Sequence, residues 1–347
     1  MLSSRRGLLT AACAAIVLAA AAVSPAAAID PKLIEAAKKE GEVVWYTGLI
    51  VRQVVLPIQE AFQKKYGIKV NFVSAASQET ALRLLNEGRA GAVKADVFDG
   101  SAPFEAVNAA GMVGTYKPEE AKDYPDYLKE PSGLWTGQII QVLVPAINTT
   151  MVKPNEAPKT FEDLLDPKWK GRLAWTHQEE TAGPPGFIGN VLLTMGKEKG
   201  MDYLQKLSKQ GIANIPSNMR VVLDQAIAGQ YPLVLSIHNY HAAISQGQGA
   251  PVEWLRLETS LLTFGTVSLL KDAPHPNAAK LFLEFLLSEE GQQVTREAGY
   301  IPAHPKVDAK TPNLKPDKGG FKVNVISPAL YKQNSEEWVK IYRSLFQ

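Results

Sequence analysis

Cysteine is almost absent from this sequence, because the single copy is Cys13, close to the start of the chain. One thiol cannot form a disulfide within the chain. The residue three positions before it is Thr10, whereas the signal for attaching a lipid at a cysteine has leucine there. We therefore expect no lipidation and no role for thiol chemistry.

The sequence also lacks the short motifs that mark common enzyme classes. It contains no G-x-S-x-G, no phosphate-binding loop, no dinucleotide fingerprint and no H-E-x-x-H. We therefore predict that the protein is not an enzyme and carries no cofactor. An exported enzyme built on the same fold remains the alternative from a different class.

The first 28 residues have the pattern of a bacterial export signal. Arg5 and Arg6 precede an apolar run, and small residues up to Ala28 supply a cleavage site. The paired arginines fit both the twin-arginine route and the general secretory route. Removing residues 1–28 would leave the 35 acidic residues balanced by an equal number of basic ones. A neutral exported chain has no electrostatic signature of binding to nucleic acid or to an anionic membrane.

The mature part of the chain begins with three strand–loop–helix units between residues 42 and 110. This alternation predicts an α/β fold with a doubly wound, mostly parallel sheet. A small hydroxyl residue follows each expected strand, and these candidate ligand-binding residues are Thr47, Ser74, Ser77 and Ser101.

Two unusually long apolar runs suggest connections between two lobes. They lie at residues 138–148 and 264–270, and Pro145 interrupts the first. Proline is not expected inside a central strand, so we interpret it as a bend from one sheet into another. This predicts a first lobe made of residues 29–143 and 262–347, a second lobe of residues 144–261, and a hinge of two crossover strands.

The segment 230–243 is the centre of the predicted binding site. A buried strand ends there and polar and aromatic residues follow, which is where open α/β sheets bind their ligands. Other strand ends and helix starts of the second lobe should converge on the same place, and helix N-termini favour an anionic group. The second-lobe candidates are Thr176, Thr181, Gly183, Asn218, Asn239, Tyr240 and His241. For His238 we expect a structural role.

Several segments together resemble the type II periplasmic solute-binding proteins of ABC importers, and among them the binders of ferric ion, organic anions and phosphonates. The resemblance is carried by residues 41–46, 94–98, 160–165, 167–171, 274–279 and 288–292. It implies a two-lobe monomer in the periplasm that closes on a small anionic solute. The partners that it implies are the transmembrane permease subunits.

The same resemblance offers a second function, the binding of ferric ion. Ferric members usually have two adjacent tyrosines after the asparagine at this strand end. Here Tyr240 matches the first tyrosine, His241 occupies the second position, and Glu79 matches the acidic ligand. Ile50 lies where a first-loop histidine is expected. A ferric ion prefers oxygen donors, so the main prediction is that no metal is bound, with Tyr240, His241 and Glu79 as the alternative set.

Overall fold

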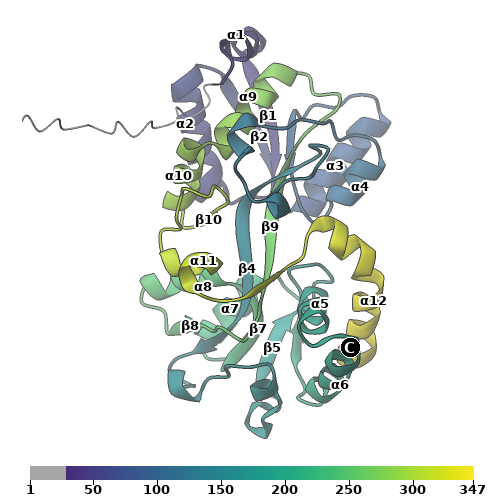
Figure 1. Ribbon diagram of the computed structural model, residues 1–347, viewed down its shortest axis with the longest axis vertical. Coiled ribbons are helices and arrows are strands. Elements are labelled where there is room, and N and C mark those ends of the chain that lie inside the picture. Colours follow the sequence, from purple (N-terminus) through teal and green to yellow (C-terminus); the bar gives the residue numbers. More distant parts are fainter. Residues whose placement is uncertain (1–28) are drawn as a thin grey trace, which may run out of the picture.

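The computed structural model describes residues 29–347, so the expected signal peptide lies outside the described residues. Figure 1 shows an elongated molecule whose two halves are joined by two long strands. These strands, β4 (Thr136–Asn148) and β9 (Ser260–Leu269), are antiparallel neighbours. The two-lobe α/β architecture with two crossover strands is therefore confirmed. No helix within residues 29–347 has the length and apolar character needed to cross a membrane.

One sheet of eleven strands runs through both lobes in the order β2-β1-β3-β9-β4-β7-β5-β6, with three short strands beside this path. The first lobe contains a parallel trio and the second lobe another, and each trio meets a crossover strand that runs antiparallel to it. The strands other than β4 and β9 are β1 (Glu42–Thr47), β2 (Lys69–Ser74), β3 (Val97–Asp99), β5 (Leu173–Thr176), β6 (Ala213–Ile215), β7 (Leu233–His238), β8 (Val252–Trp254), β10 (Ile301–Pro302) and β11 (Val323–Val325).

Helices cover the first-lobe strands (Figure 1). The core between them contains edge-to-face aromatic contacts of Trp45 and Phe62 with Phe282, an arrangement that adds to the stabilisation from burial. The Ser288 hydroxyl accepts a hydrogen bond from the Gly291 amide and caps a new helix, α10, directly after α9. The helices of this lobe are α1 (Pro31–Glu40), a π-helical turn (Val51–Val55) leading into α2 (Leu56–Tyr66), α3 (Ser77–Arg89), α4 (Phe104–Ala109), α9 (Pro276–Leu287) and α10 (Glu289–Glu297).

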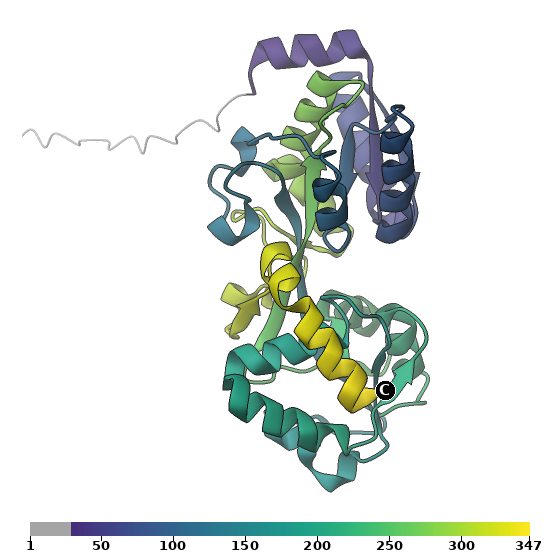
Figure 2. The ribbon, with the colours of Figure 1, turned by 90° about the vertical axis from the view of Figure 1, so that its right-hand side faces the viewer.

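The second lobe is covered in the same way, and the last helix of the chain also lies on it. Figure 2 shows α12 extending from the middle of the molecule along the lower lobe. It packs against α5 and α6, although residues 262–347 were assigned to the first lobe from the sequence. The helices concerned are α5 (Pro184–Met195), α6 (Lys197–Ser208), α7 (Met219–Ile227), α8 (Asn239–Gly247), α11 (Pro316–Gly319) and α12 (Pro328–Phe346).

Pro145 marks the place where β4 changes partners. Up to Leu143 the strand pairs with β9, and from Leu143 onward it pairs with β7, with a register shift between Val144 and Ala146. Proline cannot donate a hydrogen bond to the ladder, but its carbonyl still accepts one from the Leu255 amide. The bend expected at Pro145 is thus a local irregularity within one continuous strand.

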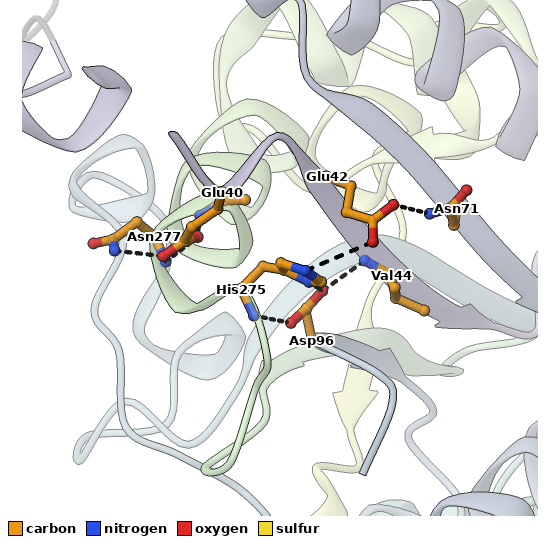
Figure 3. A network of polar contacts seen from close by, with 8 residues as sticks. Glu40, Glu42, Val44, Asn71, Asp96, His275 and Asn277 are labelled. Carbon is orange, nitrogen blue, oxygen red and sulfur yellow. Dashed lines mark hydrogen bonds and ion pairs between the residues drawn. The ribbon is translucent and has the colours of Figure 1, made fainter. Parts of the chain in front are cut away.

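A polar network joins the start of the first lobe to a segment that returns from the second (Figure 3). The buried Asp96 carboxylate accepts hydrogen bonds from the Val44 amide at 2.7 Å and the His275 amide at 2.6 Å. The Glu40 carboxylate accepts from the amides of Asn277 and Ala278 and so caps the N-terminus of α9. Although burial raises the pKa of Asp96, these donors stabilise its ionised form.

Candidate functional site

A cavity of about 240 Å³ lies between the lobes, and both lobes and both crossover strands line it. The first-lobe residues follow the carboxyl ends of β1 and β3 or begin α3, and the second-lobe residues follow β5 or begin α7 and α8. This placement agrees with the rule that open α/β sheets bind ligands beyond the carboxyl ends of their strands. The polar lining residues are Ser77, Gln78, Asp99, Ser101, Gln138, Gln141, Glu180, Thr181, His238, Thr263 and Thr266.

The crossover strands supply the floor of the cavity. Gln138 and Gln141 of β4 both line it, although residues three apart on a regular strand face opposite sides. A register shift between Gly137 and Ile139 interrupts the alternation and allows this. Polar residues inside a long apolar run are a signal that sequence reasoning could have used, and it did not.

Three of the predicted site residues line the cavity: Ser77, Ser101 and Thr181. The Ser101 hydroxyl is already engaged, because it donates to the Phe264 carbonyl and accepts from the Thr266 amide at 2.9 Å. It therefore fastens the loop after β3 to β9. Ser77 and Thr181 remain the predicted hydroxyl contacts on the two sides of the cavity.

The other predicted residues do not line the cavity, and the hydroxyl groups of three of them bond to backbone groups instead. Thr47 accepts from the Leu49 amide, Ser74 donates to the Leu49 carbonyl, and Thr176 donates to the Ser217 carbonyl. Small polar residues at strand ends often have such local roles. The residues outside the lining are Thr47, Ser74, Thr176, Gly183, Asn218, Asn239, Tyr240 and His241.

The cluster after β7 differs most from the expectation. Tyr240 is 2% exposed and lies between His238, with ring centroids 5.0 Å apart, and Tyr300, at 4.8 Å. His241 is not among the lining residues, whereas His238, for which we expect a structural role, is one of them. Burial lowers the pKa of His238 well below its usual value, so its imidazole is neutral at pH 7.

The alternative metal residues do not meet in one place. Glu79 lines a separate hollow along α3, together with Leu82 and Arg83, whereas Tyr240 is buried against Tyr300. Within residues 29–347 there is no group of three or more His, Cys, Asp or Glu side chains able to hold a metal ion.

Asp99 is the most unusual lining residue, and sequence reasoning missed it. Its side chain is 4% exposed, and its Oδ1 accepts a hydrogen bond from the Gly48 amide at 2.8 Å. Among residues 29–347 no donor meets the geometry of a hydrogen bond to its Oδ2, although the Thr47, Gln138 and Trp45 side chains lie close to the carboxyl group. Burial raises the pKa of this carboxyl to about 6. Its position in Asp99-Gly100-Ser101 at a strand end was a usable signal, but we considered only the hydroxyl.

Across the cavity, the loop after β5 contributes a second carboxylate. The Glu180 Oε2 accepts a hydrogen bond from Gln78 Nε2 of the first lobe at 3.1 Å, so the two lobes touch here. Burial also raises the pKa of Glu180. None of the residues that line the cavity is lysine or arginine.

Backbone groups are the remaining source of positive charge beside the cavity. The helices α3 and α8 begin there, and no side chain caps their first turns. The start of α5 offers no free amide, because Pro184 and Pro185 have no N–H and the Gly186 amide donates to the Gly183 carbonyl. Uncapped helix N-termini present free amides and a partial positive charge. The site therefore combines backbone donors with carboxylate, amide and hydroxyl acceptors.

Comparisons with known proteins agree with this architecture. The sequence pattern of the family described as "Bacterial extracellular solute-binding protein" matches residues 58–322. Iron uptake protein A1 of Synechocystis is 25% identical over 255 residues, which are 69% of each chain. A putative 2-aminoethylphosphonate-binding periplasmic protein of Salmonella typhimurium is 24% identical over 250 residues, 70% of this chain and 71% of that one.

Among solved structures, the periplasmic binding protein AfuA from Actinobacillus pleuropneumoniae, with fructose-6-phosphate bound, superposes with a TM-score of 0.71. The alignment covers 87% of this chain and 99% of that one at 23% identity. At this level of identity the likeness establishes the fold alone.

Proposed function

This chain belongs to the family of bacterial extracellular solute-binding proteins, and from this we propose that it is the periplasmic substrate-binding component of an ABC importer. It acts as a monomer and captures a small organic solute with an acidic group. The lobes close on the solute and present the closed form to the permease. The expected signal peptide, cut near Ala28, delivers it to the periplasm.

The observation that carries this proposal is the cavity shared by both lobes and both crossover strands. A solute there contacts both lobes only when they are closed, so its binding favours the closed form. The Gln78–Glu180 hydrogen bond crosses the gap at this place. Two strands that pass between the lobes are a suitable hinge.

The acidic group follows from the N-termini of α3 and α8 at the cavity, because backbone amides that converge there stabilise a carboxylate, phosphate or phosphonate. The names of the relatives point the same way, since one is called a binder of 2-aminoethylphosphonate and another holds fructose-6-phosphate. We propose binding without catalysis, so the solute released by denaturation should be chemically unchanged.

The test is native mass spectrometry of the purified mature protein, followed by thermal-shift screening of small carboxylates, phosphonates and sugar phosphates. A solute whose free concentration is 100 times its Kd stabilises the folded state by about 2.7 kcal/mol. We expect this to raise Tm by several degrees. If no small molecule copurifies and no compound raises Tm, the proposal fails.

The iron-binding names among the relatives motivate a separate expectation. Titration of the protein with ferric ion should produce no tyrosinate charge-transfer colour. The Tyr240 phenol lies against Tyr300, and burial raises its pKa well above the usual value, which opposes formation of the phenolate. Visible absorption that Tyr240→Phe abolishes would reinstate the ferric alternative.

A further inference from the structure

We propose that the solute carries a cationic amine in addition to its acidic group, and that Asp99 binds this amine with Glu180 facing it from the second lobe. The inference rests on the proposed function and makes the substrate class more specific: a small zwitterion. The first lobe would bind the amine, and the helix N-termini around the cavity would bind the acidic group.

The first reason is the free oxygen of Asp99. A carboxylate removed from water is costly unless it is paired and hydrogen-bonded. Asp99 is 4% exposed, its Oδ1 accepts from the Gly48 amide, and the side chains of Thr47, Gln138 and Trp45 lie near its carboxyl group. Among residues 29–347 none of these groups meets the geometry of a hydrogen bond to Oδ2, and the residue lines the cavity. Its Oδ2 is therefore available to a donor in the cavity.

The second reason is that no side chain lining the cavity can neutralise this carboxylate. The other titratable groups there are Glu180, which is also acidic, and His238, which is neutral at pH 7. An anion without a positive group would bring a third negative charge close to Asp99 and Glu180. An ammonium group avoids this repulsion and donates hydrogen bonds to both carboxylates.

The amine is tested with two sets of matched compounds. The phosphonates are 2-aminoethyl-, 2-hydroxyethyl- and propylphosphonate, and the carboxylates are 3-aminopropanoate, 3-hydroxypropanoate and butanoate. Within each set, length is constant and only the terminal group changes. We expect calorimetry on protein stripped of solute to show that the amine binds at least about tenfold more tightly than the hydroxyl and methyl members of its set. This ratio corresponds to about 1.4 kcal/mol. Equal or tighter binding of the hydroxyl or methyl member overturns the inference.

Native mass spectrometry separates this inference from the proposed function. A copurified solute without a basic nitrogen overturns the amine but leaves solute binding intact. If none of the six compounds binds, the inference fails for zwitterions of this size. If no small molecule of any kind binds, the proposed function fails as well.

The variant Asp99→Asn removes the charge but keeps an oxygen for the Gly48 amide. We expect it to weaken binding of the best amine at least about tenfold, with less than about a threefold change for the matching hydroxyl compound. The control is Glu79→Gln, which removes an exposed carboxylate outside the cavity and should change neither affinity. An unchanged amine affinity in Asp99→Asn, with apo Tm maintained, contradicts the proposal.

The pH dependence gives a second readout. Because the pKa of free Asp99 is about 6 and a bound ammonium would lower it, amine affinity should fall as the pH drops below 6. Glu180 protonates in the same direction, His238 stays neutral, and Asp99→Asn should reduce the slope. Affinity that rises on acidification would mean that protonated Asp99 donates to an acceptor, which overturns the inference.

Discussion

Replacing Trp338 with alanine should lower the free energy of unfolding by about 3–5 kcal/mol, the usual cost of removing a large buried aromatic side chain. Trp338 is the main anchor of α12 and is 3% exposed. Its ring lies over Gly189 of α5 so closely that a Cβ at Gly189 would be 2.5 Å from it. The cavity left by the substitution could not be refilled by this glycine.

The loss should extend beyond local packing, because α12 connects the two lobes. Near its start, Lys332 forms an ion pair of 2.6 Å with Glu105 of the first lobe. Near its end, Arg343 donates to Glu179, which belongs to the loop that carries Glu180. Loosening the helix therefore disturbs the loop at the cavity as well as the second lobe.

Urea denaturation followed by far-ultraviolet circular dichroism measures the effect of Trp338→Ala. Glu336→Ala is the matched control, since this neighbouring side chain on α12 is exposed, and surface changes of this kind usually alter stability by less than about 0.5 kcal/mol. Equal midpoints for the two variants would show that α12 does not stabilise the lobe.

The second large effect is expected at Gly186. Gly186 is a buried residue in the first turn of α5. A Cβ at this position would lie 1.7 Å from the Thr181 carbonyl oxygen, which belongs to the loop before the helix. Such an overlap cannot be relieved by a side-chain rotation. Gly186→Ala should therefore lower the free energy of unfolding by about 1–3 kcal/mol or more. Because the displaced turn carries Glu180 and Thr181, solute binding should be lost along with stability.

The control for this substitution is Gly247→Ala at the end of α8. A Cβ at Gly247 meets no atom within 4 Å, and alanine is favoured over glycine in a helix by up to about 1 kcal/mol. It should leave binding unchanged and stability equal or slightly higher. Denaturation and calorimetry on both variants check the pair. A Gly186→Ala protein that binds normally would mean that the turn can move without affecting the site.

The fold followed from the sequence because its signals are local. The strand–loop–helix pattern and the proline at position 145 each act on a few neighbouring residues. Two long apolar runs were enough to predict the crossover strands. The position of α12 could not be predicted in the same way. The pattern of an amphipathic helix indicates an apolar face but does not indicate which lobe covers that face.

The sequence predicted the general location of the site but not which side chains line it. A hydroxyl or amide at a strand end can satisfy its own turn or turn toward a ligand, and the sequence is the same in both cases. Thr47 and Thr176 accept hydrogen bonds from the amides two residues further on, whereas Ser77 and Thr181 line the cavity. The tertiary packing also decided between His238 and His241, by placing Tyr240 against Tyr300.

By itself, the sequence determined that this chain forms two α/β lobes joined by two strands, with polar strand ends between the lobes. The reason is that hydrophobic periodicity and turn-forming residues specify which helices and strands form. Only the tertiary structure decided which polar groups are left without a partner. Asp99 is the last residue of β3, before α4 begins, and looks like any loop carboxylate in the sequence. That its Oδ2 lacks a hydrogen-bond donor is a consequence of which amides and side chains fold around it.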